Sequence, residues 1–266
     1  MTFTITQSKL KNVIFKILKI LVVTAFWILV WEAVSRVMSR DNELMLLILP
    51  SPFTVIKRWL EVAFTEPFIK AVAASFSRIF WGFLLGTVFG VALGVLTHVL
   101  PVADLFLSPI LKVIRAVPVI AISILLFLFF ESDALPVCIV CLMVMPLIWQ
   151  TVFDGLKNPD RELLEMAKIY KLGRTKTFLF VKVPKVLPIL LSSSVSALGL
   201  GFKSGIAAEV ISLPKTALGT TLWQSRGNVD FTEIYVVTLT VVVLSLLIEL
   251  LLKWAVGLVV KKEEKV

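Results

Sequence analysis

The chain has 266 residues, of which 58% are hydrophobic and only 17% are charged, and its formal net charge is +9. A soluble domain is nearer about 45–50% apolar and about 25% charged, so this composition excludes an ordinary soluble protein. The mean hydropathy is +0.97, and several apolar runs approach the ~20 residues that a bilayer-crossing helix needs. Together they indicate a polytopic membrane protein.

Apolar runs predict an all-α fold with about six membrane spans. The first run is basic and then apolar for too long to be a cleavable signal, so it is interpreted as a retained span. The predicted spans are 13–36, 70–97, 118–130, 134–153, 186–210 and 234–257. The third is short, and Pro109 and Pro118 predict that it begins in a broken or tilted segment.

The basic residues of the connecting segments predict the orientation, because lysine and arginine are retained on the cytoplasmic side. Seventeen of the 27, including Lys112 and Arg115, fall on the face that carries both termini and the segment 154–185, and seven fall on the other face. Both tails, 1–12 and 258–266, are therefore predicted to be cytoplasmic, and the transmembrane domain is predicted to be 13–257 with its core at 70–257. The asymmetry accounts for most of the net charge, so no nucleic-acid partner is expected.

Glycine recurs at every fourth position of the second span, at Gly82, Gly86, Gly90 and Gly94. Each four-residue step advances a helix by about 400°, so the glycines form a stripe nearly parallel to the axis. In lipid the hydrophobic effect does not drive helices together, and such a stripe lets two backbones approach closely. Extended backwards by fours, the stripe reaches Arg78. Its charge is expected to find a partner or a polar cavity, with snorkelling to the outer interface as the alternative.

Two further charges lie in the fifth span. Lys203 and Glu209 are about 120° apart in projection, so they are not expected to pair directly. A lysine that faces hydrocarbon costs about 3 kcal/mol, and Lys203 is therefore predicted to face the pathway or another subunit. With Arg78 it could attract an anionic substrate, and a structural salt bridge is the alternative. Glu209 is near the outer end, where a hydrogen bond to a helix terminus or loop is expected.

No residue pattern predicts catalysis. Cys138 and Cys141 have CxxC spacing, but the chain has one histidine, His98, and no second cysteine pair, so they are interpreted as buried thiols and not as a zinc site. The stretch "GLGFKSG" at 199–205 lacks the spacing of a phosphate-binding loop. Neither a cofactor nor ATP chemistry is expected of this chain.

The segment 154–185 is long for a connection between spans and is rich in helix formers. A cap-like sequence at 158–160 predicts a helix that Gly173 breaks, and a second short helix is expected before Pro184 and Pro188 open the next span. Composition leaves two alternatives open, a docking element for a partner and a basic loop held at an anionic lipid surface.

This segment resembles the cytoplasmic signature of the transmembrane permease subunits of ATP-binding-cassette (ABC) importers, type I binding-protein-dependent class. That signature is Glu-Ala-Ala, three residues, Gly, about nine residues, then Ile-x-Leu-Pro. The Glu-x-Ala core and the final hydrophobic-x-hydrophobic-Pro match, and the 19-residue distance from Glu165 to Pro184 is the family's. Met166 replaces the first alanine, and Gly173 comes two residues late, with Lys171 where glycine is expected. The residues that the resemblance assigns to coupling are Glu165, Met166, Ala167, Tyr170, Lys171 and Gly173.

Four further stretches resemble the nitrate, taurine and aliphatic-sulfonate branch of that family: "ILPSPFTVIKRW", "SFSRIFWGFLLGTVFGVALGVL", "SPILKVIRAVPVIAISILLFLFF" and "LGLGFKSGIAAEVI". The resemblance implies a type I permease topology in the bacterial cytoplasmic membrane. It implies cytoplasmic ATPase subunits that bind the segment 160–176 and a second permease subunit, expected to be identical. It also implies an extracytoplasmic binding protein that meets the loop 211–228. The implied substrate is a small solute, either a nitrate-, sulfonate- or taurine-type anion or a pyrimidine-like vitamin precursor.

Two other classes stay open as alternatives. A stand-alone secondary transporter is usually longer and shows internal repeats, and none is convincing here. A membrane scaffold protein would explain the segment 154–185 but not the match across several spans. A membrane enzyme is disfavoured, because no catalytic constellation is present.

Overall fold

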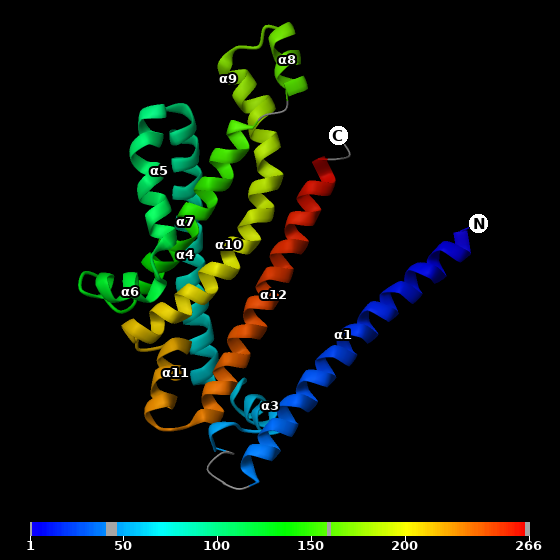
Figure 1. Cartoon of the computed structure of the whole chain (residues 1–266), viewed down its shortest axis with the longest axis vertical. Helices are drawn as coiled ribbons and strands as arrows, with labels where there is room; N and C mark the ends of the chain where they lie inside the picture. The colour runs from blue at the N-terminus through cyan, green and yellow to red at the C-terminus, as the bar shows by residue number, and fades with distance from the viewer. Residues whose placement is uncertain (1, 41–46, 159–160, 264–266) are drawn as a thin grey trace. The chain divides into compact units, whose positions relative to one another are not determined.

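The computed structural model describes residues 2–40, 47–158 and 161–263, and every regular element within them is helical. Within these residues, five helices are long and apolar enough to cross a membrane, or six if one bent pair counts as a single span. The predicted all-α class is confirmed in the described part of the chain (Figure 1).

The chain forms two compact units. The first comprises residues 1–65 and 225–238 and contains α1 (Thr2–Ser39), α3 (Pro52–Val62) and the start of α12 (Phe231–Glu263). The second comprises residues 66–224 and 239–266 and contains the rest of α12, most of α11 (Leu218–Gly227) and the remaining elements. These are α4 (Glu66–Val99), α5 (Pro101–Ala116), α6 (Val119–Phe127), α7 (Ala134–Lys157), α8 (Arg161–Ile169), α9 (Arg174–Thr177), the π-helix η1 (Phe178–Lys182) and α10 (Val183–Ser212).

The first unit holds a short helix, α3, that the span prediction did not include. Its start signal is nevertheless in the sequence, because Pro52 occupies the first turn and the Ser51 hydroxyl accepts the backbone N–H of Thr54 at 3.2 Å. An ion pair at 3.2 Å between Arg58 and Glu233 ties α3 to the first turn of α12. The unit is therefore closed by contacts between segments far apart in sequence.

The core of the second unit is built on α4 and α7, with α10 packed against both. All four glycines of the stripe are buried. A Cβ built on any of them would lie 2.6–2.9 Å from a Cβ of α7, far inside ordinary contact. The facing residues are Val140, Val144, Ile148 and Val152, which also recur every fourth position.

The helices α4 and α7 are parallel, because residue numbers increase in the same direction along both stripes. The helix backbones approach so closely that an added Cβ at Gly90 would lie 2.7 Å from the carbonyl oxygen of Met145. The glycines cost helix propensity, about 1 kcal/mol each relative to alanine. The rigid β-branched side chains fill the groove that the glycines leave, and this packing replaces the missing hydrophobic drive between helices in lipid.

The predicted third span at 118–130 is wrong in its start, because α5 precedes α6 in this part of the chain. The break expected near Pro118 is confirmed, since α5 and α6 are bent by 103° relative to each other there, whereas Pro109 lies inside α5. In Figure 1, α5 leaves the end of α4 and runs back alongside it. Lys112 and Arg115 thus lie at the end of α5 remote from the α4–α5 link, and Arg115 donates to the Gln150 side chain on α7. Without these two residues, fifteen lysines and arginines remain on the face predicted to be cytoplasmic, against seven on the other predicted face.

The expected second short helix and the fifth span form one helical run from Arg174 to Ser212. Pro184 does not interrupt it, although proline cannot donate to the carbonyl four residues earlier. The preceding turn is π-helical, with the Val183 N–H bonded to the Phe178 oxygen. This wider turn lies where the proline ring would otherwise crowd an α-helical backbone.

Some predicted features lie outside the described residues. Pro159 and Asp160 of the cap-like sequence belong to these, as do the side chains of the predicted tails, 1–12 and 258–266. The backbone of residues 2–12 is helical and continues directly into the first span.

The α4–α7 contact predicts the effect of a single methyl group. Gly90→Ala should gain about 1 kcal/mol of helix propensity but lose about 1–3 kcal/mol through overpacking, because its Cβ meets Met145 and Ile148 at 2.7 Å. Thermal unfolding in detergent should therefore show a lower Tm than the wild type. Gly257→Ala in α12, where nothing lies within 4 Å of an added Cβ, is the matched control and should not lower the Tm. A Gly90→Ala protein as stable as the control would contradict the packing argument.

Candidate functional site

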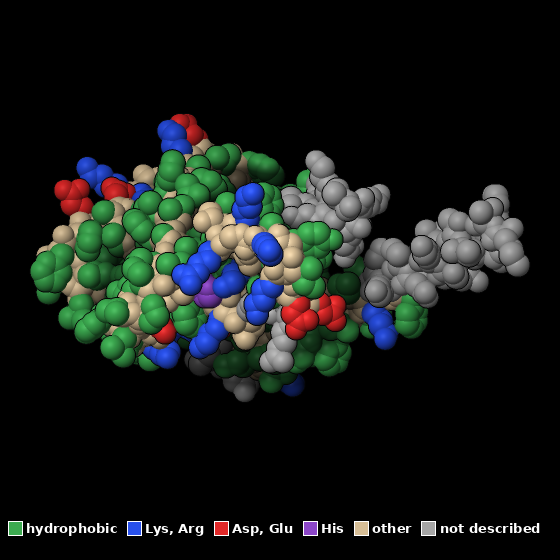
Figure 2. Space-filling view, turned by 90° about the horizontal axis from the view of Figure 1, so that it is seen from above, with side chains coloured by type: hydrophobic (Ala, Val, Ile, Leu, Met, Phe, Trp, Pro, Cys, Tyr) green, Lys and Arg blue, Asp and Glu red, His purple; other side chains and the backbone are tan. Residues whose placement is uncertain are grey.

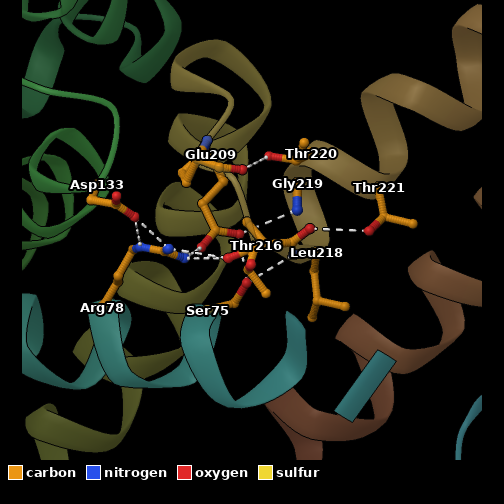
Figure 3. Close-up of polar contacts among 11 residues, drawn as sticks. Ser75, Arg78, Asp133, Glu209, Thr216, Leu218, Gly219, Thr220 and Thr221 are labelled. Atoms are coloured by element: carbon orange, nitrogen blue, oxygen red, sulfur yellow. Dashed lines mark hydrogen bonds and ion pairs between the residues drawn. The ribbon is translucent and has the colours of Figure 1, made fainter. Parts of the chain in front are cut away.

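A buried carboxylate organises the end of the second unit where α10 turns into α11 (Figure 3). The Glu209 side chain is fully buried. Its Oε2 accepts the Ser75 hydroxyl at 2.7 Å and the backbone N–H of Gly219 at 3.2 Å, and its Oε1 accepts from Arg78 at 3.1 Å. Ser75 in turn accepts the backbone N–H of Leu218 at 2.9 Å. Glu209 and Ser75 therefore accept one N–H group each from the first turn of α11, where such groups have no partner within the helix.

Arg78 links three segments at this position. Besides Glu209, its guanidinium donates to the Thr216 carbonyl oxygen at 3.0 and 3.1 Å and to Asp133, which precedes α7. The Arg78 side chain is 13% exposed, whereas that of Asp133 is 69% exposed. The sequence left two roles open for Arg78, and the structure shows its guanidinium in ion pairs with Asp133 and Glu209.

The backbone of the α10–α11 connection has its own constraint. Leu213 ends α10 in the left-handed region, with φ 51°. A Cβ at Gly219 would lie 2.4 Å from the Cβ of Glu209, so only glycine allows this approach. We refer to Ser75, Arg78, Asp133, Glu209 and the segment 213–219 as the polar clasp.

Lys203 does not join the polar clasp. It is exposed on α10 and forms no ion pair with a described residue. Ser192 and Ser196 are also exposed and lie on the same side of α10, since eleven positions advance a helix to within about 20° of the start. We refer to this lysine and the two hydroxyls as the polar strip of α10.

At the other end of the second unit, α8, α9 and η1 form a hairpin between α7 and α10. One face of α8 is inward, with Ala167 2% exposed. Large apolar side chains away from this face are exposed, among them Met166 and Ile169 of α8, the latter at 78%, and Tyr170 directly after the helix at 73% exposure. Glu165 is exposed as well. Apolar side chains gathered on a projecting helix mark an interaction surface.

The predicted break at Gly173 is wrong by two residues. α8 ends at Ile169, and Lys171 adopts the left-handed conformation with φ 50°. The N–H of Leu172 bonds to Ala167 O at 2.9 Å and that of Lys171 to Lys168 O at 3.0 Å, which is a Schellman ending. Lys171 is thus at the position where the resemblance expects glycine, at a cost of about 1 kcal/mol in backbone strain. Gly173 instead precedes α9 in an extended conformation.

Sequence reasoning missed three members of the polar clasp. Ser75 and Asp133 carry no local signal, and Thr216 contributes only its carbonyl oxygen. Ser75 lies three residues before Arg78, on the same side of α4, and that spacing is the one available hint. The cysteines take no part: Cys138 and Cys141 are free thiols on α7, partly buried, and no metal-binding group is found among the described residues.

Comparison with known proteins gives a consistent result. The family described as binding-protein-dependent transport system inner membrane component matches residues 86–265. The nitrate import permease protein NrtB of Leptolyngbya laminosa is 28% identical over 196 residues, which are 73% of this chain and 70% of that protein. The taurine transport system permease protein TauC of Escherichia coli is 26% identical over 211 residues, or 77% and 76% of the two chains.

Solved structures agree at the level of the fold. An inward-facing conformation of the MetNI methionine ABC transporter superposes with a TM-score of 0.59 at 18% identity. It covers 76% of this chain and 98% of that chain.

The polar clasp predicts unequal effects for its two carboxylates. Glu209→Ala leaves a partly buried arginine without its buried partner and should lower the free energy of unfolding by about 3–5 kcal/mol. Asp133→Ala removes an exposed partner of the same arginine and should cost about 0–1 kcal/mol. Thermal unfolding of both variants in one detergent measures the difference, and equal shifts in Tm would contradict the assignment.

Proposed function

Because the chain belongs to the family of binding-protein-dependent transport system inner membrane components, and is thus an inner-membrane permease of an ABC importer, we propose how its parts work. Two copies form the translocation pathway, with both termini and the α8 hairpin in the cytoplasm. Separate ATPase subunits drive it, and an extracytoplasmic binding protein delivers the substrate. A stand-alone secondary transporter is not favoured, because the family match includes the hairpin and the spans on both sides of it.

The observation that carries the proposal is the exposed apolar face of α8. Met166, Ile169 and Tyr170 are exposed among the residues that the structure describes, next to Glu165 of the signature. We infer that this face enters a groove on the ATPase, with Lys171 and Gly173 shaping the turn behind it. Burial of such side chains stabilises a contact by about 1.5–3 kcal/mol each, so the contact between the hairpin and the ATPase can persist while the ATPase moves.

The packing of α4 against α7 supports rigid transmission. When ATPase closure displaces the hairpin, α10 moves with it, because one helical run joins Arg174 to Ser212. α10 packs on α7 and α4, whose backbones are in direct contact. The polar clasp fixes the far end of α10 to α4 and α11. A displacement at the hairpin is therefore carried to the extracytoplasmic loops that meet the binding protein.

The substrate class follows from Lys203. A lysine in hydrocarbon costs about 3 kcal/mol, so the polar strip on α10 requires a polar surface opposite. We infer that this surface is the pathway between two copies, and that Lys203 attracts a small anion while Ser192 and Ser196 donate to it. The relatives named for nitrate and taurine fit this chemistry, since one solute is an anion and the other carries a sulfonate.

Loss of the apolar face should uncouple the ATPase. Ile169→Glu places a charge in the proposed groove and should abolish copurification of the ATPase subunits and ATP-driven uptake, with expression retained. Ile69→Glu, the same change at a 49% exposed isoleucine in the first turn of α4, is the matched control and should leave copurification intact. An Ile169→Glu protein that still copurifies with the ATPase would refute this contact.

Two substitutions of Lys203 test whether its positive charge, and not only its size, is needed for anion uptake. In proteoliposomes that hold the whole importer, Lys203→Gln should reduce uptake of the transported anion about tenfold, while Lys203→Arg should retain most of it. The expected tenfold loss corresponds to about 1.4 kcal/mol of lost attraction. The anion is found by testing nitrate, taurine and an alkanesulfonate against the wild type. Equal uptake by the glutamine and arginine variants would exclude an electrostatic role.

A further inference from the structure

A pocket of about 570 Å³ lies beneath the hairpin, on the side of α8 that faces away from the proposed ATPase contact. Its floor is the last turn of α4, where the apolar span ends, and its walls come from α8, α9 and η1. The apolar part of the lining consists of Val99, Leu164, Ala167, Leu172 and Phe178. Both ends of the π-helical turn contribute to it, and such turns frequently occur at functional sites.

The polar part of the lining is cationic. Lys168, Arg174 and Lys182 line the pocket, and none of the lining residues is acidic. The Lys182 ammonium lies 2.9 Å from Nε2 of His98, so this contact has an uncharged imidazole nitrogen accepting from the ammonium. Lys168 and Arg174 form no ion pair with any residue that the structure describes. Figure 2 shows the histidine amid a cluster of lysine and arginine side chains at this end of the molecule.

We propose that this pocket binds an anionic phospholipid, with the phosphate of the headgroup against Lys168, Arg174 and Lys182. The apolar walls receive the adjoining glycerol and acyl segments. Three observations favour a lipid over a carboxylate of the ATPase. The lining combines apolar walls with cations, the pocket opens at the end of a membrane span, and it lies on the opposite face of α8 from Ile169. Basic pockets between membrane helices bind anionic headgroups elsewhere for the same electrostatic reason.

In this proposal one face of α8 contacts the ATPase and the opposite face contacts the phospholipid. A lipid wedged between α8 and the end of α4 fixes the angle at which the hairpin presents its apolar face. The lipid composition of the membrane would then regulate the joint between the permease and the ATPase. This regulatory consequence rests on the proposed function, whereas binding of the lipid itself does not.

The test uses the full chain in nanodiscs of phosphatidylcholine alone or with phosphatidylglycerol, and native mass spectrometry counts the phosphatidylglycerol retained after detergent transfer. The double variant Lys168→Gln/Arg174→Gln should retain it about 25-fold less than the wild type, since each basic side chain near a membrane surface contributes about fivefold. Lys157→Gln/Lys176→Gln removes the same charge from exposed positions outside the pocket and should retain it like the wild type.

Two outcomes would overturn the proposal. An equal loss of retained phosphatidylglycerol in the two double variants would mean that the basic surface attracts anionic lipid in general and that the pocket is not a specific site. Displacement of phosphatidylglycerol by inorganic phosphate would mean that the pocket binds a bare anion. Copurification of the ATPase is measured separately on the same variants. A failed ATPase contact at Ile169 therefore leaves the lipid result interpretable, and a failed lipid result leaves that contact standing.

Discussion

The second unit depends on the backbone contact between α4 and α7. Four glycines on one helix and four β-branched residues on the other interlock in register over more than three turns, with an added Cβ at each glycine falling at 2.6–2.9 Å from its facing residue. Water supplies no hydrophobic drive between helices inside a bilayer, so close packing of this kind must hold the helices together. A close-packed interface has few alternative arrangements, because neither side can shift without a clash. The pair therefore behaves as one rigid body.

This rigid pair explains why the polar clasp and the hairpin, at opposite ends of the second unit, belong to one device. α4 contributes Ser75 and Arg78 to the clasp and His98 to the pocket beneath the hairpin. α10 contributes Glu209 at one end and continues without a break into η1 and α9 at the other. The buried carboxylate costs desolvation energy, and its bonds to the α11 N–H groups and to Arg78 offset that cost. These directional bonds fix the angle between α10 and α11, whereas apolar packing alone would let one helix slide along the other.

The sequence predicted the parts of this structure that repeat or that depend on composition alone. The glycine stripe, five of the six spans, each overlapping an observed membrane-length helix, and the extent of the α8 segment all follow from periodicity and apolar runs. The clasp could not be predicted, because Ser75, Asp133 and the Thr216 carbonyl come together only after three separate segments have folded. The third span was misplaced because Asp104, Lys112 and Arg115 lower the mean hydropathy of α5, so the prediction began at 118 and left α5 out. The break that Pro118 predicted does occur, where α5 and α6 meet at 103°. Arg115 is accommodated because the Gln150 side chain on α7 accepts its hydrogen bond.

The turn of the hairpin shows why a motif match does not fix a conformation. Read by composition, Gly173 is the residue most able to end a helix, yet Lys171 takes the left-handed position and Gly173 lies in extended backbone. The Schellman hydrogen bonds determine which residue is left-handed, because they join Leu172 to Ala167 and Lys171 to Lys168. They place the turn at the same distance from Glu165 as the family's glycine. Geometry is thus retained where residue identity is not. The strain accepted at Lys171 keeps the outward face of α8 and the cationic pocket behind it in a fixed relation, and both proposed partners of this helix depend on that relation.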